Sequence, residues 1–209
     1  MSLYVPPHFA TPDRASFARI AHEHPFATLL TPASPEPLVT HLPLVHVADR
    51  EPHGTLFGHF ARANPHCAAD TGAESLAIFH GPHAYVSPSW YADPATSVPT
   101  WNYVVAHAHG VVELAADAAE TRAVLDLLVR RFESTRTTPW QPGLSARQLD
   151  AMVGAIVGFR IRLRRVETKF KLSQNRSADD RARVAAGLAA EGYAEADATA
   201  AWMRELASR

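Results

Sequence analysis

Apolar and polar residues alternate with a period of two in several short segments, which is the pattern of half-buried β-strands. In the stretch 156–168, for example, Phe159, Ile161 and Leu163 are separated by arginines, which predicts one buried face and one basic outer face. A proline at position 43 predicts an edge strand or a bulge there. The predicted strands are residues 26–31, 38–47, 55–60, 76–80, 101–114 and 156–168.

Helical periodicity appears in other segments, mostly outside the strand-rich part. Thr11 followed by Pro12 and Asp13 is typical of a helix start, and predicts a helix over 12–23. Two capping boxes, Asp117 to Glu120 and Ser145 to Gln148, predict two more helices. The remaining helical segments are expected from Asn64 to about Asp70, from Ser177 to Gly192, and from there to Arg209.

The order of these elements decides the fold class. Five or six strands with helices grouped at the edges, rather than alternating with them, argue against a parallel α/β sheet. The sequence therefore predicts an α+β protein, a small β-barrel of antiparallel strands with peripheral helices.

Composition excludes several kinds of protein. The 209 residues are 47% hydrophobic and 20% charged, as in ordinary globular proteins, and the net charge of -1 provides no field for nucleic acid or anionic membrane. Cys67 is the single cysteine, so no intrachain disulfide is possible. The start of the chain lacks the pattern of a signal peptide, and no apolar run has membrane-spanning length. We expect a cytoplasmic protein without membrane contact.

The stretch Gly81–Tyr103 is the most distinctive part of the sequence. It contains Trp90, Tyr91 and Trp101 and four prolines, which exclude a continuous helix. Flanked by two predicted strands, it predicts a long ordered loop that presents a flat ligand site. The alternative is a proline-rich surface loop whose aromatic residues only cover the core.

Two other segments have the residue types of an anion site. In Gly58–His66, His59 and Arg62 precede a predicted helix start, an arrangement that suits a phosphate, although arginine there is often only a surface residue. In the segment KFKLSQNR, Lys169 and Lys171 lie on one face of an extended chain. The neutral hydrogen-bonding groups of Ser173, Gln174 and Asn175 follow, so the segment can hold a phosphate together with the polar edge of a ring, or be a solvated basic turn.

Common catalytic and nucleotide motifs are missing. The sequence has no GxGxxG, P-loop, HExxH, GxSxG or CxxC. All 12 histidines lie at or before His109, and His107 and His109 share one face of a predicted strand, as two metal ligands would. No carboxylate or thiolate cluster accompanies them, so we assign no metal site and no catalytic residue.

Four motifs, GHFARANP, FHGPHAYVSPSWY, VPTWNYVVAHAHG and KFKLSQNR, resemble those of one family in the same order. This family is the PaiB-type FMN-binding negative transcriptional regulators. The resemblance spans nearly the whole chain and implies a split β-barrel of the FMN-binding, pyridoxine phosphate oxidase-like kind. It further implies a domain over 1–172, a helical extension over 173–209, and a homodimer that holds FMN at or near the subunit interface.

The resemblance also implies a set of flavin-contacting residues. The strand at Thr40 would run along the ring, the turn at Arg62 would approach the phosphate, Trp101 would wall the slot, and Lys171 would close it. The full predicted set is Thr40, His41, His59, Arg62, Asn64, Trp90, Trp101, Asn102, Lys171, Ser173 and Gln174.

The regulatory role has less support in the residues. Residues 176–209 carry five arginines against six carboxylates and no clear helix-turn-helix, whereas a recognition helix should present a net positive face. Regulation would then act on DNA directly or through a flavin-dependent signal. Two other functions remain open: a flavin-dependent oxidoreductase, and a haem- or metal-binding protein with His107 or His109 as ligand.

Overall fold

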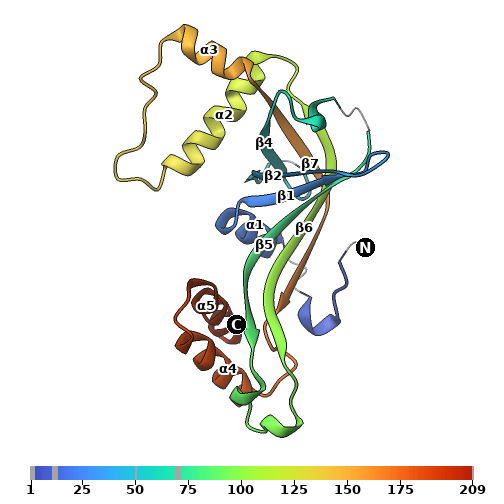
Figure 1. Cartoon of the computed structure of the whole chain (residues 1–209), viewed down its shortest axis with the longest axis vertical. Coiled ribbons are helices and arrows are strands. Elements are labelled where there is room, and N and C mark those ends of the chain that lie inside the picture. Colours follow the sequence, from blue (N-terminus) through green and yellow to red (C-terminus); the bar gives the residue numbers. More distant parts are fainter. Residues whose placement is uncertain (1–2, 11–13, 50, 69–71, 209) are drawn as a thin grey trace. The chain divides into compact units, whose positions relative to one another are not determined.

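Seven strands form one sheet in the computed structural model, which describes residues 3–10, 14–49, 51–68 and 72–208. The strand order is β2-β1-β5-β6-β7-β4-β3, and the β1–β2, β1–β5, β3–β4 and β4–β7 pairs are antiparallel (Figure 1). The strands are β1 (Phe26–Thr31), β2 (Leu38–Pro43), β3 (Val45–Val47), β4 (Thr55–Ala61), β5 (Ser75–Val86), β6 (Thr100–Leu114) and β7 (Ile156–Lys171).

Within these described ranges, five α-helices and four short 3-10 helices accompany the sheet. The α-helices are α1 (Arg14–Glu23), α2 (Ala118–Glu133), α3 (Ala146–Gly154), α4 (Ala178–Ala190) and α5 (Ala194–Ala207). The 3-10 helices are η1 (Pro7–Phe9), η2 (Pro65–Cys67), η3 (Pro88–Trp90) and η4 (Pro94–Thr96). The predicted caps of α2 and α3 are confirmed, since Asp117 and Ser145 each accept a hydrogen bond from the backbone of the first turn. Helix α4, expected to begin at Ser177, has a cap of the same kind at that residue. The helix start predicted at residues 11–13, and residue Asp70, lie outside the described residues.

The prediction of one strand over 38–47 is wrong, because the segment divides into β2 and β3. Pro43 has no N–H to donate, and the amide of Leu44 leaves the ladder to bond the carbonyl of Pro25 at 2.8 Å. The side chain of Leu44 is fully buried at the break. The two strands lie at opposite ends of the strand order, so the break lets one segment of chain supply both edges of the sheet.

The predicted loop over 81–103 is also shorter than expected, since β5 continues to Val86 and β6 begins at Thr100. Strand β5 continues through Gly81 because glycine has no Cβ. A Cβ at this position would lie 3.0 Å from Cβ of Val104, so glycine permits the close approach of β6. The connection is reduced to residues 87–99, which contain η3 and η4. The lysine segment changes in the same way, because β7 extends to Lys171 instead of ending near residue 168.

The chain forms two compact units, each assembled from separate segments. Unit 1 consists of Met1–Phe17, His80–Ala106 and Glu167–Arg209, and unit 2 consists of Ala18–Phe79 and His107–Val166. Strands β5, β6 and β7 contribute residues to both units. The domain boundary expected between residues 172 and 173 stays a prediction.

In unit 1 the helices α4 and α5 pack beside the ends of β5, β6 and β7 (Figure 1). The rings of Phe170 and Trp202 meet edge to face with centroids 5.1 Å apart, and Leu188 is fully buried. Helix α4 also packs on η3, where a Cβ at Gly187 would lie 2.5 Å from Cδ2 of Trp90. One face of this part of the sheet is therefore covered by helices.

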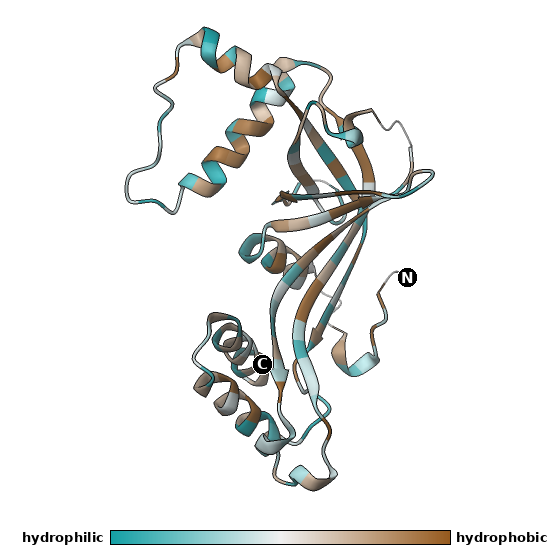
Figure 2. Ribbon diagram, in the orientation of Figure 1, coloured by the Kyte–Doolittle hydropathy of each residue, from teal (hydrophilic) through white to brown (hydrophobic). Residues whose placement is uncertain are grey.

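In unit 2 helix α2 packs on β3 and β4. Figure 2 shows brown apolar and teal polar residues alternating along α2, as expected for a helix with one buried face. Val124 and Leu128 on that face form a buried cluster with Val45. The hydroxyl of Thr121 also accepts a hydrogen bond from the amide of Gly158 at 3.2 Å, which ties the helix to β7.

Within the described part of the chain, none of the helices combines the length and the apolar character needed to span a bilayer.

Candidate functional site

The candidate site lies in unit 1, on the face of the sheet that α4 and α5 leave open. On β6, Asn102 and Val104 are buried, whereas Trp101 and Tyr103 point to the other face and are at least partly exposed. Residues of β5 and β6 line a cavity of about 360 Å³ there, a volume within the range of small-molecule sites. Its lining residues are His80, Gly81, His83, Trp101, Tyr103, Val104 and Val105.

Aromatic rings form much of this face. The indole of Trp101 lies 6.3 Å from the imidazole of His83 and 6.1 Å from the ring of Tyr85, measured between ring centroids. The Tyr85 contact is edge to face, so the ring of Tyr85 does not lie parallel over the indole. The side chain of Trp101 is 53% exposed, which leaves a large apolar surface in contact with water. Such a surface suits a flat, aromatic ligand.

Two lysines of β7 lie beside these rings. The ammonium groups of Lys169 and Lys171 are 5.3 and 6.0 Å from the ring centroid of Tyr103, and Lys169 is also 5.4 Å from that of Tyr4. Lys169 is only 7% exposed. Among the described residues, neither ammonium forms an ion pair with a carboxylate, and lysine is almost never so buried without a partner.

Lys171 is held in place by β6. Its ammonium donates hydrogen bonds to Oγ1 of Thr100, at 2.6 Å, and to the carbonyl oxygen of Trp101. Burial, and then the positive charges of Lys169 and Arg176, lower the pKa of Lys171. An anion bound here would relieve the repulsion between these cations, so the electrostatics favour a negatively charged ligand.

Three predicted site residues support this face from behind. The amide of Asn102 donates to Oγ of Ser173 at 3.0 Å and lies 3.2 Å from the sulfur of Met203. Ser173 has a positive φ of 66°, and the side chain of Gln174 bonds the backbone of Phe170 and Leu172 around it. These contacts fasten the turn that follows Lys171. Direct flavin contacts by these three residues stay predictions.

Trp90 is placed differently from Trp101. It is half-buried against Gly187 of α4. Its neighbour Tyr91 is buried, with the guanidinium of Arg176 stacked 4.5 Å from the ring centroid. The structure thus places one predicted tryptophan on the open face and the other against a helix.

The other predicted residues belong to unit 2, where three polar side chains form a hydrogen-bonded cluster. Asn64 donates to Oγ1 of Thr40 at 3.0 Å, and its own oxygen accepts the amide of His66. Nδ1 of His66 lies 2.9 Å from the same hydroxyl. His66 is 5% exposed and stacks on Phe60, and within the described chain its Nε2 has no hydrogen-bond partner.

Sequence reasoning missed His66, although its position directly after Asn-Pro at a helix start was a usable signal. Burial lowers the pKa of its imidazole, which favours the neutral form. A buried polar atom without a partner costs free energy. The cluster can therefore offer one hydrogen-bonding group to a ligand.

His41 and Arg62 form hydrogen bonds outside this cluster. His41 Nδ1 lies 3.1 Å from the hydroxyl of Thr28. Burial lowers the pKa of His59, whose Nδ1 has no partner among the described residues. Arg62 donates to the carbonyl oxygens of Gly154, at 2.6 Å, and Ile156, at 2.8 Å, so it clasps the end of β4 to the α3–β7 turn. The phosphate contact predicted for Arg62 stays a prediction.

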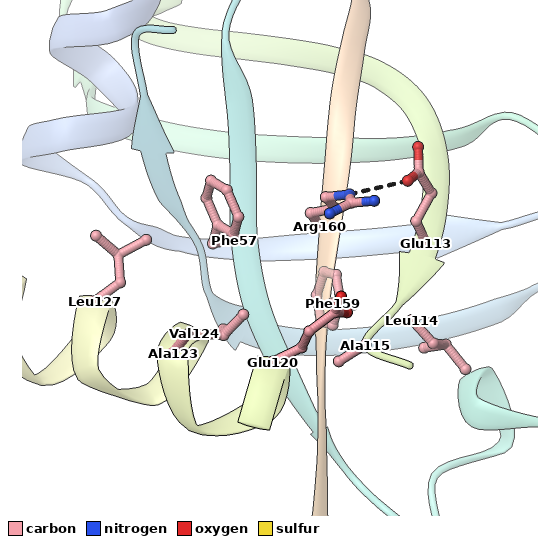
Figure 3. Close-up of a pocket in the computed structure, with 10 residues that line it drawn as sticks. All are labelled: Phe57, Glu113, Leu114, Ala115, Glu120, Ala123, Val124, Leu127, Phe159 and Arg160. Carbon is pink, nitrogen blue, oxygen red and sulfur yellow. Dashed lines mark hydrogen bonds and ion pairs between the residues drawn. The ribbon is translucent and has the colours of Figure 1, made fainter. Parts of the chain in front are cut away.

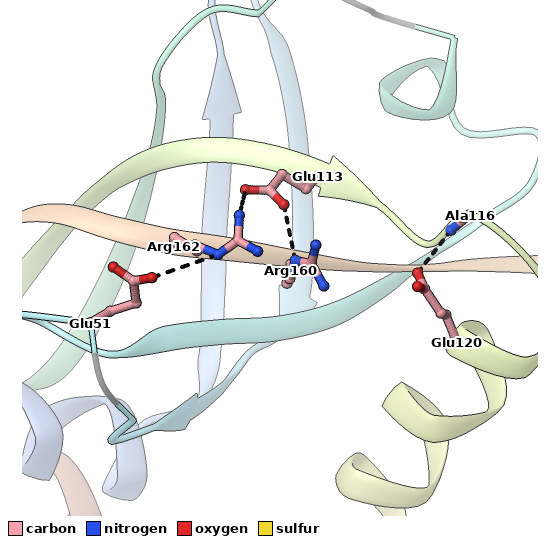
Figure 4. Close-up of polar contacts among 6 residues, drawn as sticks. All are labelled: Glu51, Glu113, Ala116, Glu120, Arg160 and Arg162. Atoms are coloured by element: carbon pink, nitrogen blue, oxygen red, sulfur yellow. Dashed lines mark hydrogen bonds and ion pairs between the residues drawn. The ribbon is translucent and has the colours of Figure 1, made fainter.

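The arginines of β7 are largely paired with carboxylates. Glu113 of β6 binds both Arg160, at 2.9 Å, and Arg162, which also lies 3.7 Å from Glu51 (Figure 4). Arg165 lies 4.0 Å from Glu74, which is also 3.6 Å from Nδ1 of buried His109. These pairs reduce the net positive charge of a face that the sequence predicts to be basic.

A small pocket of about 210 Å³ lies between α2 and the sheet in unit 2. Figure 3 shows Val124 and Leu127 of α2 on one side of it, with Phe57 on β4 and the Arg160–Glu113 pair on β7 and β6. Its volume is below the range of ordinary small-molecule sites. We therefore do not assign the flavin to this pocket.

Comparisons with known proteins show which family the chain matches. Residues 3–165 match a family described as "Putative FMN-binding domain". The chain is 34% identical over 181 residues to the "Protease synthase and sporulation protein PAI 2" of Bacillus subtilis (strain 168), which covers 85% of each chain. It is also 34% identical over 171 residues to an uncharacterised protein of Aspergillus fumigatus, which covers 64% of this chain and 66% of that protein.

Solved structures share the fold at low sequence identity. The flavocytochrome Anf3 from Azotobacter vinelandii superposes with a TM-score of 0.63 at 15% identity, over 86% of this chain and 78% of that one. The FAD- and haem-binding protein from Mycobacterium smegmatis superposes with a TM-score of 0.61 at 19% identity, over 88% and 80%. The predicted α+β split barrel is confirmed, and the chain belongs to the FMN-binding domain family with the PaiB-type proteins.

Proposed function

We propose that the open face of unit 1 binds FMN, and that the protein is an FMN-binding negative transcriptional regulator of the PaiB type. Membership of a flavin-binding family supports a flavin as ligand. The observation that carries the proposal is the pair Lys169 and Lys171, two cations beside the half-buried ring of Tyr103 without a carboxylate partner among the described residues.

The residues on this face fit the parts of FMN. The ammonium groups of Lys169 and Lys171 would hold the phosphate or another electron-rich edge of the cofactor. The rings of Trp101 and Tyr103 would cover the flat ring system, and His83 would offer a hydrogen-bonding group at its edge. Bound FMN supplies one- and two-electron redox chemistry.

Other residues of the predicted flavin set lie in unit 2. The hydroxyl of Thr40 and the amide of Asn64 are organised by His66 into a polar cluster, and Arg62 keeps one guanidinium nitrogen outside its two backbone contacts. We propose that a homodimer in the cytoplasm completes the pocket. Native mass spectrometry of the purified protein tests this, because a dimer carrying one FMN per chain is expected and a stable monomer would contradict it.

A regulatory role through a flavin-dependent signal fits the charges better than direct binding to DNA. Glu113 and Glu51 neutralise Arg160 and Arg162, so phosphate contacts on this face would have to compete with existing ion pairs. Deletion of the gene should change transcription of the regulated genes. A mobility-shift titration across salt concentrations would show a steep slope if the β7 arginines contact DNA phosphates.

FMN binding itself is tested by titration of the purified protein. We expect quenching of tryptophan emission, since Trp101 lies on the proposed site, and a shift of the flavin absorption bands. Saturation at one FMN per chain supports the proposal, whereas unchanged spectra of both protein and ligand would contradict it.

A flavin-dependent oxidoreductase is a second candidate. It is favoured by the histidines His80 and His83, whose exposed imidazoles lie beside the aromatic surface and can form hydrogen bonds with a substrate. This function predicts steady-state oxidation of a reduced nicotinamide in the presence of an electron acceptor. A regulator without enzymatic activity would bind FMN and show no turnover.

A further inference from the structure

A second, larger cavity lies in unit 2 and contains none of the aromatic or lysine residues of the flavin proposal. It is formed by α2, α3 and the connecting segment 134–145, with His59 of β4 and Ile156 of β7 at the sheet. Its volume is about 830 Å³, which is in the range of drug-sized ligand sites. Figure 1 shows the connecting segment as a long arc between the two helices. Loops of this length without regular secondary structure are uncommon in compact domains.

The cavity wall is mostly apolar and leaves large side chains in water. Val129 on α2, Trp140 and Leu144 in the connecting segment, and Met152 on α3 are 37%, 54%, 36% and 60% exposed. They are four of the twelve large hydrophobic side chains that are exposed in the described chain. Gathering them around one hollow concentrates uncovered apolar surface where a ligand would cover it. Methionine adapts its shape to different ligands, and tryptophan provides a flat contact area.

The charged groups at the cavity balance one another. Two arginines, Arg122 and Arg130, are matched by two acids, Asp126 and Glu133. The carboxylate of Glu133 accepts the backbone amide of Trp140 at 2.7 Å, which holds the connecting segment to α2. Because burial lowers the pKa of His59, its imidazole adds no charge near neutral pH. The lining thus has no excess charge to attract an anion or a cation.

We propose that this cavity binds an uncharged, largely apolar small molecule that contains a ring system. The ligand packs between Trp140 and Met152, so it covers exposed apolar surface on both α3 and the connecting segment. The four charged side chains lie at the rim of the cavity, where they stay in contact with water. Of the residues predicted to contact FMN, the cavity contains His59, and none of the unit 1 residues that form the proposed flavin site. The cavity gives the protein a second place, filled separately from FMN, to sense a hydrophobic compound.

The test uses the full chain and the neutral fluorescent probe N-phenyl-1-naphthylamine, whose emission rises in apolar surroundings. We expect saturable binding of one probe per chain that excess FMN does not displace. Met152→Glu places a charge in the wall at an exposed position and should weaken the probe's Kd at least about tenfold, because a buried carboxylate is costly. Val98→Glu is the matched control, since Val98 is 64% exposed and lies in unit 1, and it should leave the Kd unchanged.

Other outcomes overturn the proposal. Displacement of the probe by FMN would mean that the two share one site. Non-saturating binding, or equal weakening by Met152→Glu and Val98→Glu, would indicate a general sticky surface. If the probe fails to bind, and Met152→Glu instead converts a dimer to a monomer in native mass spectrometry, the apolar wall is an interface between copies of the chain. FMN titration of the same samples reports on the flavin proposal separately.

Discussion

Replacing Lys171 with methionine is the most direct test of the cationic face in unit 1. The substitution keeps an unbranched side chain, one atom shorter, and removes its charge. In the structure, two of the three ammonium donors already bond Thr100 and the carbonyl of Trp101, so one donor remains for a ligand. One hydrogen bond to a charged group contributes about 1.5–3 kcal/mol, which corresponds to a roughly 10- to 150-fold weaker Kd for FMN.

The assay compares FMN with riboflavin, which has the same ring and no phosphate. If Lys171 contacts the phosphate, Lys171→Met weakens FMN binding by this factor and leaves the Kd for riboflavin unchanged. Arg183→Met is the control for net charge, because Arg183 is an exposed cation of α4 that pairs with Asp179. It should change neither Kd.

Two results would refute this reasoning. An unchanged Kd for FMN in Lys171→Met would place the cofactor elsewhere. Equal weakening of FMN and riboflavin would show that the lysine acts on the ring or on the local fold, and circular dichroism with thermal unfolding would separate those two cases. Lys169→Met should weaken FMN binding as well, since Lys169 forms no ion pair within the described residues and its ammonium lies 5.3 Å from the ring centroid of Tyr103, beside Lys171.

Three further predictions follow from named contacts. FMN affinity should fall as the pH rises through the pKa of Lys171, because the phosphate binds the protonated ammonium and raises its pKa. Since burial lowers this pKa, the fall should come at a lower pH than for an ordinary lysine. Titrations across alkaline pH should show no such fall for riboflavin, which has no phosphate. Gly187→Ala should reduce the free energy of unfolding by about 1–3 kcal/mol, because the new Cβ would clash with the Trp90 ring. Gly154→Ala is the control and should leave this free energy unchanged, since a Cβ there meets nothing within 4 Å. Urea denaturation of the two variants measures the difference. Arg62→Met should lower the free energy of unfolding by about 1 kcal/mol and lower Tm, because two backbone carbonyls lose their donor. An unchanged Tm would contradict a stabilising role for these two hydrogen bonds.

Local signals in the sequence determined most of the elements. Periodicity of two located β1, β4 and β6, and the capping residues Asp117 and Ser145 located two helices, because these patterns depend on neighbours close in the chain. The spacing of Lys169 and Lys171 also predicted their shared face, which their common contact with Tyr103 confirms. The family motifs determined the fold class, since they span nearly the whole chain.

Only the tertiary structure decided which side chains are open to a ligand. Trp90 and Trp101 look alike in sequence, but α4 covers the first, and no described side chain stacks on the second. Arg160 and Arg162 look free in sequence, but Glu113 on the neighbouring strand neutralises both. His66 gained its role from a hydroxyl 26 residues away in the chain. Burial and pairing depend on residues distant in sequence, and a pattern of near neighbours carries no information about them.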